Sequence, residues 1–276
     1  AVAAAAFLLR DPAGDLLGGW TGEEEPAAQV KALGALGASL FQPARDTQPY
    51  AAIDHVGVNP YGVNTFLDDV DGFNLSFGSS TSSDDTDSSR FVDSVIADTL
   101  PNTPWTLSAG NSGPGNIDFN SPANSYNAIT VAAADDVDTE SRDDDVLAGY
   151  SSRGPTASGR RKPDLAAPGT DIKSANQHWE VQQDWIEKDG TSMAAPMVLG
   201  VAMALMDAGL IDELGIKATL INTAQKNEPG YDFESDSDGW VEGMGWGDLN
   251  TWAAYYHRSD HRVAVLAPRN QPGDYL

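Results

Sequence analysis

The sequence has no cysteine among its 276 residues, so neither disulfide bonds nor thiolate metal sites can contribute to it. It also has no run of 18 or more apolar residues, the length that a membrane-spanning helix requires. Residues 1–9 are apolar, but they lack the basic leader and the cleavage pattern that are typical of a signal peptide. The sequence therefore predicts neither a disulfide scaffold nor a membrane-spanning segment.

Basic residues are also scarce. Lys and Arg number 16 against 41 Asp and Glu, which gives a net charge of −25. Such a surface repels nucleic acids and anionic membranes, so we expect neither as a partner. Self-repulsion at this charge density opposes compaction unless salt screens it. We therefore predict a halophilic or saline origin, or a Ca²⁺-rich setting; the alternative is an ordinary acidic secreted protein.

With 41% hydrophobic residues, the chain can bury one sizeable core. Apolar segments of strand length alternate with segments of helical periodicity. Strands are predicted at residues 38–42, 50–58, 72–77, 105–109 and 128–134. Helices are predicted at residues 1–9, 27–33, 90–100, 197–206, 212–223 and 248–256. This alternation predicts an α/β fold with a mainly parallel sheet that is covered on both faces.

The remaining segments are predicted to be irregular. Residues 79–89 form a Ser/Asp/Thr tract that is typical of an exposed loop. We expect an irregular insertion at residues 225–246 and a surface tail from residue 257 onward. The helix predicted at residues 1–9 begins without a capping residue, which is unusual for a helix start.

The segment Gly-Thr-Ser-Met-Ala-Ala-Pro at residues 190–196 precedes the apolar run 197–206. This order places a serine at the N-terminus of a helix, where free backbone N–H groups and the helix dipole favour negative charge. A serine nucleophile needs such a setting, because its attack on an amide carbonyl creates an oxyanion. Taken alone, the same segment is also compatible with a Thr/Ser N-cap on a buried helix.

This segment resembles the serine segment of the subtilisin-like serine proteases (subtilases), and three further stretches resemble that family in the same order. These are Asn-Leu-Ser-Phe-Gly at residues 74–78, Ser-Ala-Gly-Asn-Ser-Gly-Pro at 108–114, and the stretch 150–155 with 162–170, which is similar to the loop before the serine. The resemblance implies a three-layer α/β/α fold with a mainly parallel sheet. It also implies a serine endopeptidase that cuts peptide bonds through an acyl-enzyme.

The resemblance assigns Ser192 as the nucleophile and Asn111 as the side-chain donor to the oxyanion. Residues that line the substrate site would be Ser76, Phe77 and Gly78 together with Ser108, Ala109 and Gly110. Substrate would pair with such segments as an added strand. Two alternatives stay open: Asn111 is also a good turn residue, and Phe77 is also a good core residue.

The general base is the difficulty, because a serine hydroxyl is a weak nucleophile without one. No histidine among His55, His178, His257 and His261 lies in a Gly-rich helix start as the family pattern requires. Asp54 and His55 are adjacent, so on a strand they point to opposite faces and cannot orient each other.

An alignment that fits the family pattern better than Asp54 and His55 do places the family's histidine about three residues before Ala1. The chain is then expected to cover the C-terminal two-thirds to three-quarters of a subtilase catalytic domain. Residues 1–257 would belong to that domain, without its Asp and His segments, and residues 258–276 would form the tail. The missing N-terminal segment would be a partner of this chain.

No cofactor is expected to be required, and no metal ligand is assigned. Asp232, Asp236 and Asp238 alternate before Gly239, a pattern that is reminiscent of calcium loops but lacks the Glu at the twelfth position. A structural calcium ion and a solvated acidic loop both fit this segment.

Two functions fit the sequence. The first is an endopeptidase acting on protein or peptide substrates. The second is a pseudoprotease that binds peptides or serves as a structural module. The intact serine and asparagine segments favour the enzyme, whereas the absent Asp and His segments argue against activity of this chain alone. The resemblance and the acidic, cysteine-free composition predict an extracellular, secreted protein.

Overall fold

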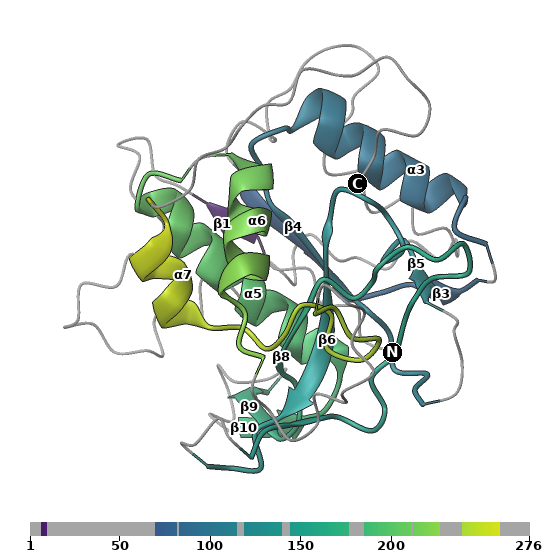
Figure 1. Cartoon of the computed structure of the whole chain (residues 1–276), viewed down its shortest axis with the longest axis vertical. Coiled ribbons are helices and arrows are strands. Elements are labelled where there is room, and N and C mark those ends of the chain that lie inside the picture. The colour runs from purple at the N-terminus through teal and green to yellow at the C-terminus, as the bar shows by residue number, and fades with distance from the viewer. Residues whose placement is uncertain are drawn as a thin grey trace.

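The computed structural model describes part of the chain, and Figure 1 shows the arrangement of its elements. The described residues are 7–9, 70–81, 83–114, 119–139, 144–176, 185–210, 212–226 and 239–259. The elements predicted at residues 27–33, 38–42 and 50–58, the acidic segment 232–238 and the tail beyond residue 259 lie outside these ranges. Within them, no helix combines the length and apolarity that crossing a bilayer demands.

A mixed, mainly parallel sheet forms the centre of the molecule. Its strands are β1 (Phe7–Leu9), β2 (Val70–Leu75), β4 (Trp105–Ser108), β6 (Ile129–Asp135), β7 (Val146–Leu147) and β8 (Leu165–Pro168). The strand order is β1-β2-β4-β6-β7, and β8 also pairs with β6. The pairs β2–β4, β4–β6 and β6–β8 are parallel, whereas β1 and β7 are antiparallel to their neighbours. The predicted mainly parallel sheet is confirmed.

Helices cover both faces of this sheet. On one face lie α3 (Asp87–Ser94) and the π-helical turn η2 (Val95–Thr99). The other face carries α5 (Thr191–Asp207), which packs across β2, β4, β6 and β8 and is flanked by α6 (Glu213–Thr223) and α7 (Thr251–His257) (Figure 1). The helices predicted at 90–100, 197–206, 212–223 and 248–256 are therefore present, with shifted ends.

The alternation of side chains along the strands separates two cores. Trp105 and Leu107 of β4 pack with Ile96 on the α3 side. Val131 of β6 packs with Leu199 of α5 on the opposite side. Because successive strand residues point to opposite faces, the sheet can be apolar on both sides, as a buried parallel sheet requires. The result is the expected three-layer α/β/α arrangement.

The helix predicted at residues 1–9 is wrong where the structure describes it. Phe7–Leu9 form strand β1, which pairs with β2 in the register Phe7↔Phe73 and Leu9↔Val70. Helix propensity is a weak preference, and the backbone hydrogen bonds offered by the edge of β2 outweigh it for three residues.

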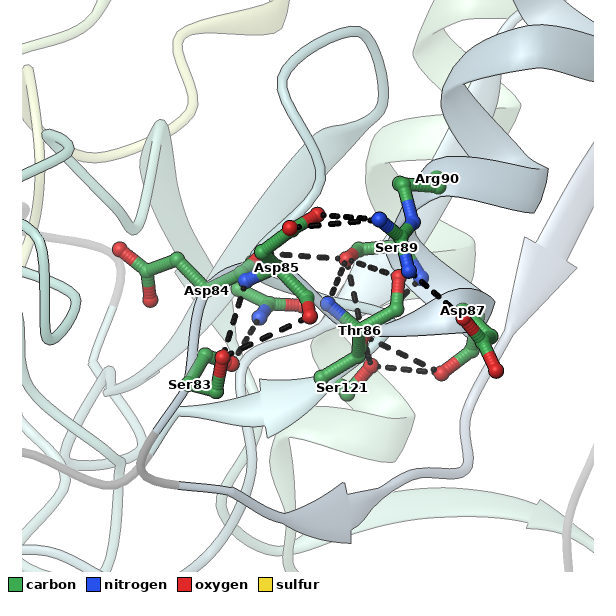
Figure 2. Close-up of polar contacts among 10 residues, drawn as sticks. Ser83, Asp84, Asp85, Thr86, Asp87, Ser89, Arg90 and Ser121 are labelled. Carbon is green, nitrogen blue, oxygen red and sulfur yellow. Dashed lines mark hydrogen bonds and ion pairs between the residues drawn. The ribbon is translucent and has the colours of Figure 1, made fainter.

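The exposed loop predicted at residues 79–89 is also wrong in part. β3 (Ser79–Ser80) pairs with β5 (Asn120–Ser121), and α3 begins at Asp87. Thr86 caps that helix in a reciprocal pair with Ser89, and its hydroxyl also lies 2.5 Å from that of Ser121 (Figure 2). Short hydroxyl side chains bond readily to nearby backbone, so this tract forms a helix start rather than a free loop.

Asp84 in the same tract is buried and ties it to a distant turn. Its carboxylate accepts hydrogen bonds from the Thr156 hydroxyl at 2.5 Å and from the Ser158 backbone N–H at 2.7 Å. Burial alone would raise the pKa of Asp84, but the hydrogen bonds from Ser158 and Thr156 outweigh it and lower the pKa. The carboxylate is therefore part of the fold rather than a solvated loop charge.

Two further differences concern the C-terminal half. The hairpin of β9 (Ile172–Ala175) and β10 (Trp185–Lys188) was not predicted, and the stretch predicted as a loop before the serine contains β8. The predicted irregular insertion at 225–246 contributes to the core, because Val241 and Met244 pack against Ala132 and Ala166 of the sheet. Short apolar runs such as these carry too little periodicity to be placed without their tertiary partners.

Candidate active site

The predicted functional segments meet at one edge of the sheet. Ser76 follows β2, Asn111 follows β4, and Gly169 follows β8, so all three lie beyond the carboxyl ends of parallel strands. The N-terminus of α5 reaches the same edge through Gly190, whose N–H donates to the Gly169 carbonyl at 2.8 Å. This edge is where α/β sheets collect their functional groups.

Ser192 is the second residue of α5 and is half-buried. Its backbone carbonyl accepts a hydrogen bond from the Ser76 hydroxyl at 3.0 Å, and its own hydroxyl lies 3.4 Å from the Ser76 carbonyl oxygen. The preceding Gly190 has φ 149°, a backbone conformation that favours glycine, and it provides no side-chain cap. The turn therefore leaves the helix N-terminus open beside Ser192.

Asn111 is held by its amide oxygen. That oxygen accepts hydrogen bonds from the backbone N–H and from the hydroxyl of Thr191, each at 3.0 Å. The Thr191 hydroxyl in turn accepts from the Gly110 N–H at 3.1 Å. Because the oxygen is committed to Thr191, the Asn111 Nδ2 group faces the turn: a Cβ atom at Gly190 would lie 3.2 Å from it.

Two hydrogen-bond donors are therefore available next to the Ser192 hydroxyl. The first is the Nδ2 group of Asn111, whose residue is exposed. The second is the Ser192 backbone N–H, which as an early helix N–H has no acceptor within the described part of the chain. Two N–H groups at the positive end of a helix suit an oxyanion.

The two predicted substrate segments differ in what they can offer. In the Ser108–Ala109–Gly110 segment the N–H of Ala109 bonds to the Val131 carbonyl at 2.9 Å, and the N–H of Gly110 is used as described above. This segment is buried, so it can serve as a wall rather than as a pairing strand. In the other segment Ser76 is buried, Phe77 is half-buried against the α3-side core, and Gly78 is exposed.

Tyr150 and Thr191 are structural members of the site that the sequence reasoning missed. The Tyr150 hydroxyl donates to the Gly169 carbonyl at 2.7 Å and accepts from the Gly190 N–H at 3.1 Å. It thereby joins the end of β8 to the turn before Ser192. Burial raises the pKa of this phenol, so it stays a neutral donor near pH 7. The adjacent hydroxyls at 191 and 192 are a visible signal for Thr191. Tyr150 begins the family-like stretch 150–155, but nothing in that stretch indicates its contact with Gly190.

Among the described residues, no imidazole or carboxylate is hydrogen-bonded to the Ser192 hydroxyl. His257 lies on α7, which packs beside α6, and its ring contacts Tyr256. His55, His178, His261 and Asp54 lie outside the described residues, as do Asp232, Asp236 and Asp238. Within the described ranges no group of three or more carboxylate or imidazole side chains is placed to hold a metal ion.

A family model and several known proteins match this chain. The family model described as "Subtilase family" matches residues 38–247, which is more than half of the chain. Serine protease AprX of Bacillus subtilis is 42% identical over 110 residues, which cover 36% of this chain and 25% of AprX. Halolysin of Haloferax mediterranei is 34% identical over 116 residues, which cover 42% of this chain and 19% of halolysin.

Among solved structures, the patellamide maturation protease PatA superposes with a TM-score of 0.57 at 20% identity, over 81% of this chain and 74% of PatA. At that identity the likeness shows the fold alone. The matches span a quarter or less of the length of the two curated relatives named above. The family resemblance expected from the four sequence segments is confirmed: this chain belongs to the subtilase family.

Proposed function

We propose that the protein is a serine endopeptidase in which Ser192 is the nucleophile and Asn111 completes the oxyanion hole. The observation that carries this proposal is a pair of N–H donors at the open N-terminus of α5, Asn111 Nδ2 and the Ser192 backbone N–H, for which the described part of the chain supplies no acceptor. Membership of the subtilase family supports the same reaction class.

The reaction would proceed in two steps. The Ser192 oxygen attacks the carbonyl carbon of the scissile amide and loses its proton to a general base. The carbonyl oxygen becomes an oxyanion that accepts hydrogen bonds from the two donors. The base then protonates the departing amine, which leaves an acyl-enzyme on Ser192 that water hydrolyses. We propose that the base and its orienting carboxylate come from an N-terminal segment outside this chain.

Proteins or peptides would be the substrates. The exposed Gly78 and the backbone that precedes it offer an edge on which an extended peptide can pair, while residues 108–110 would wall the site. No cofactor enters this reaction.

Labelling with a serine-directed fluorophosphonate tests the proposal. The reagent is applied in high salt to this chain alone and to the protein purified from its source, with Ser192→Ala as the control. Labelling at Ser192 in the native material but not in this chain alone is the expected result. No labelling of either folded sample would show that the serine is not activated, and the pseudoprotease would then replace the endopeptidase.

We also propose that the protein works outside the cell in concentrated salt. The net charge of −25 and the similarity to halolysin support this assignment. Screening should relieve self-repulsion, so the melting temperature should rise between low and molar NaCl. A melting temperature that stays constant over this range would contradict the high-salt assignment and leave the protease proposal untouched.

A further inference from the structure

Three successive backbone carbonyls converge on one lysine at the opposite end of the sheet from Ser192. The Lys217 ammonium of α6 donates to the carbonyls of Tyr126 and Ala128 at 2.8 and 2.9 Å, and to that of Asn127 at 3.3 Å. Asp164 Oδ1 lies 3.3 Å from the same nitrogen. Four oxygens from two separate segments therefore surround one cation.

A second ammonium group completes the cluster. Lys162 donates to the Ala128 carbonyl at 2.8 Å and to Asp164 Oδ2 at 2.6 Å. Asp164 Oδ2 also accepts from the Thr130 N–H at 2.7 Å. The exposed fractions of the side chains are 4% for Lys162, 6% for Asp164 and 13% for Lys217, so solvent screens these charges little.

Glu213 is a second buried acidic residue on the same helix. It lies four residues before Lys217, on the same side of α6, and is 1% exposed. Its Oε1 has no hydrogen-bond partner in the described part of the chain.

Backbone carbonyl and carboxylate oxygens are the ligands that hard cations take in proteins. Consecutive carbonyls that point at one place repel one another unless a cation lies between them. We propose that residues 126–128 and Asp164 form a site for a small monovalent cation, which the chain fills with its own Lys217 ammonium while Lys162 neutralises Asp164.

The site connects α6 to the segment that leads from β5 to β6. The start of that segment lies against the proposed substrate walls: a Cβ atom at Gly78 would be 2.8 Å from the Asn120 Cβ, and one at Gly110 would be 2.6 Å from Asn120 Nδ2. Filling the site with a tethered cation therefore holds this segment without any dissociable ion. This consequence for substrate binding rests on the proposed function, whereas the cation site itself does not.

Chemical rescue of Lys217→Ala tests the site. The variant empties the position of the ammonium and of its stem, so its melting temperature in a low-salt choline buffer should fall by about 5–15 °C. Adding n-propylammonium should restore most of this loss at millimolar concentration, because the ion replaces both the charge and the stem. Neutral 1-propanol at the same concentration should restore none of it.

Two matched variants separate the cation site from general packing. Lys217→Met fills the stem volume without the charge, so it should lose similar stability and gain nothing from propylammonium. Lys173→Ala, on the exposed hairpin strand β9, should melt as the wild type does. If Lys217→Ala fails to fold in plain buffer, refolding yield with and without propylammonium gives the same readout. No loss in Lys217→Ala, or a loss that propylammonium does not recover better than propanol, would overturn the proposal.

Discussion

The two ends of the central sheet hold opposite kinds of polar cluster. At the carboxyl end, the Ser192 N–H and Asn111 Nδ2 have no hydrogen-bond acceptor among the described residues, beside a helix terminus that glycine keeps open. At the amino end, carbonyl oxygens and the carboxylate of Asp164 are acceptors already filled by Lys162 and Lys217.

The donors at the α5 terminus are available to a ligand, whereas the acceptors around Lys217 are already bonded within the chain. Donors left free at the α5 terminus cost little, because water can reach the exposed Asn111 and the half-buried Ser192. The Ala128 carbonyl and the Asp164 carboxylate are buried and have no such access, so the chain supplies their partners itself, whereas Tyr126 is exposed and Asn127 is half-buried. Similar hydrogen-bonding groups are therefore open to solvent at one end of the sheet and bonded within the chain at the other.

Removing the donor at the open end should have the largest effect. Asn111→Asp keeps the oxygen that accepts from Thr191 but loses Nδ2, so kcat of the proposed endopeptidase on a peptide substrate should fall by about 10²–10³-fold, the size found for this donor in a subtilisin. The melting temperature should stay within about 2 °C of the wild type. A fall in kcat smaller than about tenfold would remove Asn111 from the oxyanion hole.

The second-largest effect is expected at Glu213, at the amino end of the sheet. Burial raises the pKa of Glu213 to about 7 from its ordinary value of 4.5. Between these values the folded state keeps a proton that the unfolded chain has lost, so the free energy of unfolding should decrease as the pH rises from 4.5 to 7, by about 3 kcal/mol.

Glu213→Gln cannot titrate and should lose this part of the pH dependence. Compared with the wild type, it should be about equal in stability near pH 4.5 and more stable at pH 8, by up to about 3 kcal/mol. Urea unfolding of both proteins across this pH range measures the difference. A constant difference between the two curves would show that Glu213 does not change its charge there.

Thr191→Val should have a smaller effect on catalysis. The change keeps the backbone N–H that bonds to Asn111 but removes the hydroxyl that lies between Gly110 and the Asn111 oxygen. Asn111 would be held less firmly, and kcat should fall by about tenfold, corresponding to the loss of one hydrogen bond. Thr191→Ser, which keeps the hydroxyl, should stay within about twofold; equal losses in both variants would contradict this positioning role.

Arg90 should have the smallest effect, because its ion pairs are exposed. It pairs with Asp85 at 3.2 Å and with Asp87 at 2.7 Å, and these side chains are 61–81% exposed (Figure 2). Arg90→Ala should therefore change the free energy of unfolding by less than about 0.5 kcal/mol at 0.15 M salt. A loss of stability as large as that of Lys217→Ala would show that burial does not explain the difference between the contacts of Lys217 and the exposed ion pairs of Arg90.

Much of the fold was predictable from local patterns. The strands at β4 and β6 and the helices α5 and α6 contain enough consecutive apolar or periodic residues to specify their type. Helix α3 was predicted from its apolar periodicity, but its true start depends on hydroxyl contacts around Thr86. Strand β1 was wrongly predicted as a helix, because its three apolar residues do not indicate that they pair with the edge of β2.

The sequence by itself determined the family, the alternation that builds a parallel sheet, and the identity of Ser192 and Asn111 as candidate site residues. These depend on short segments whose chemistry is local. Only the tertiary structure decided that Thr191 and Tyr150 position the site, and that Lys162, Lys217 and Asp164 surround the carbonyls of residues 126–128. Such contacts join segments far apart in the chain, and their strength comes from burial, which only the folded packing creates.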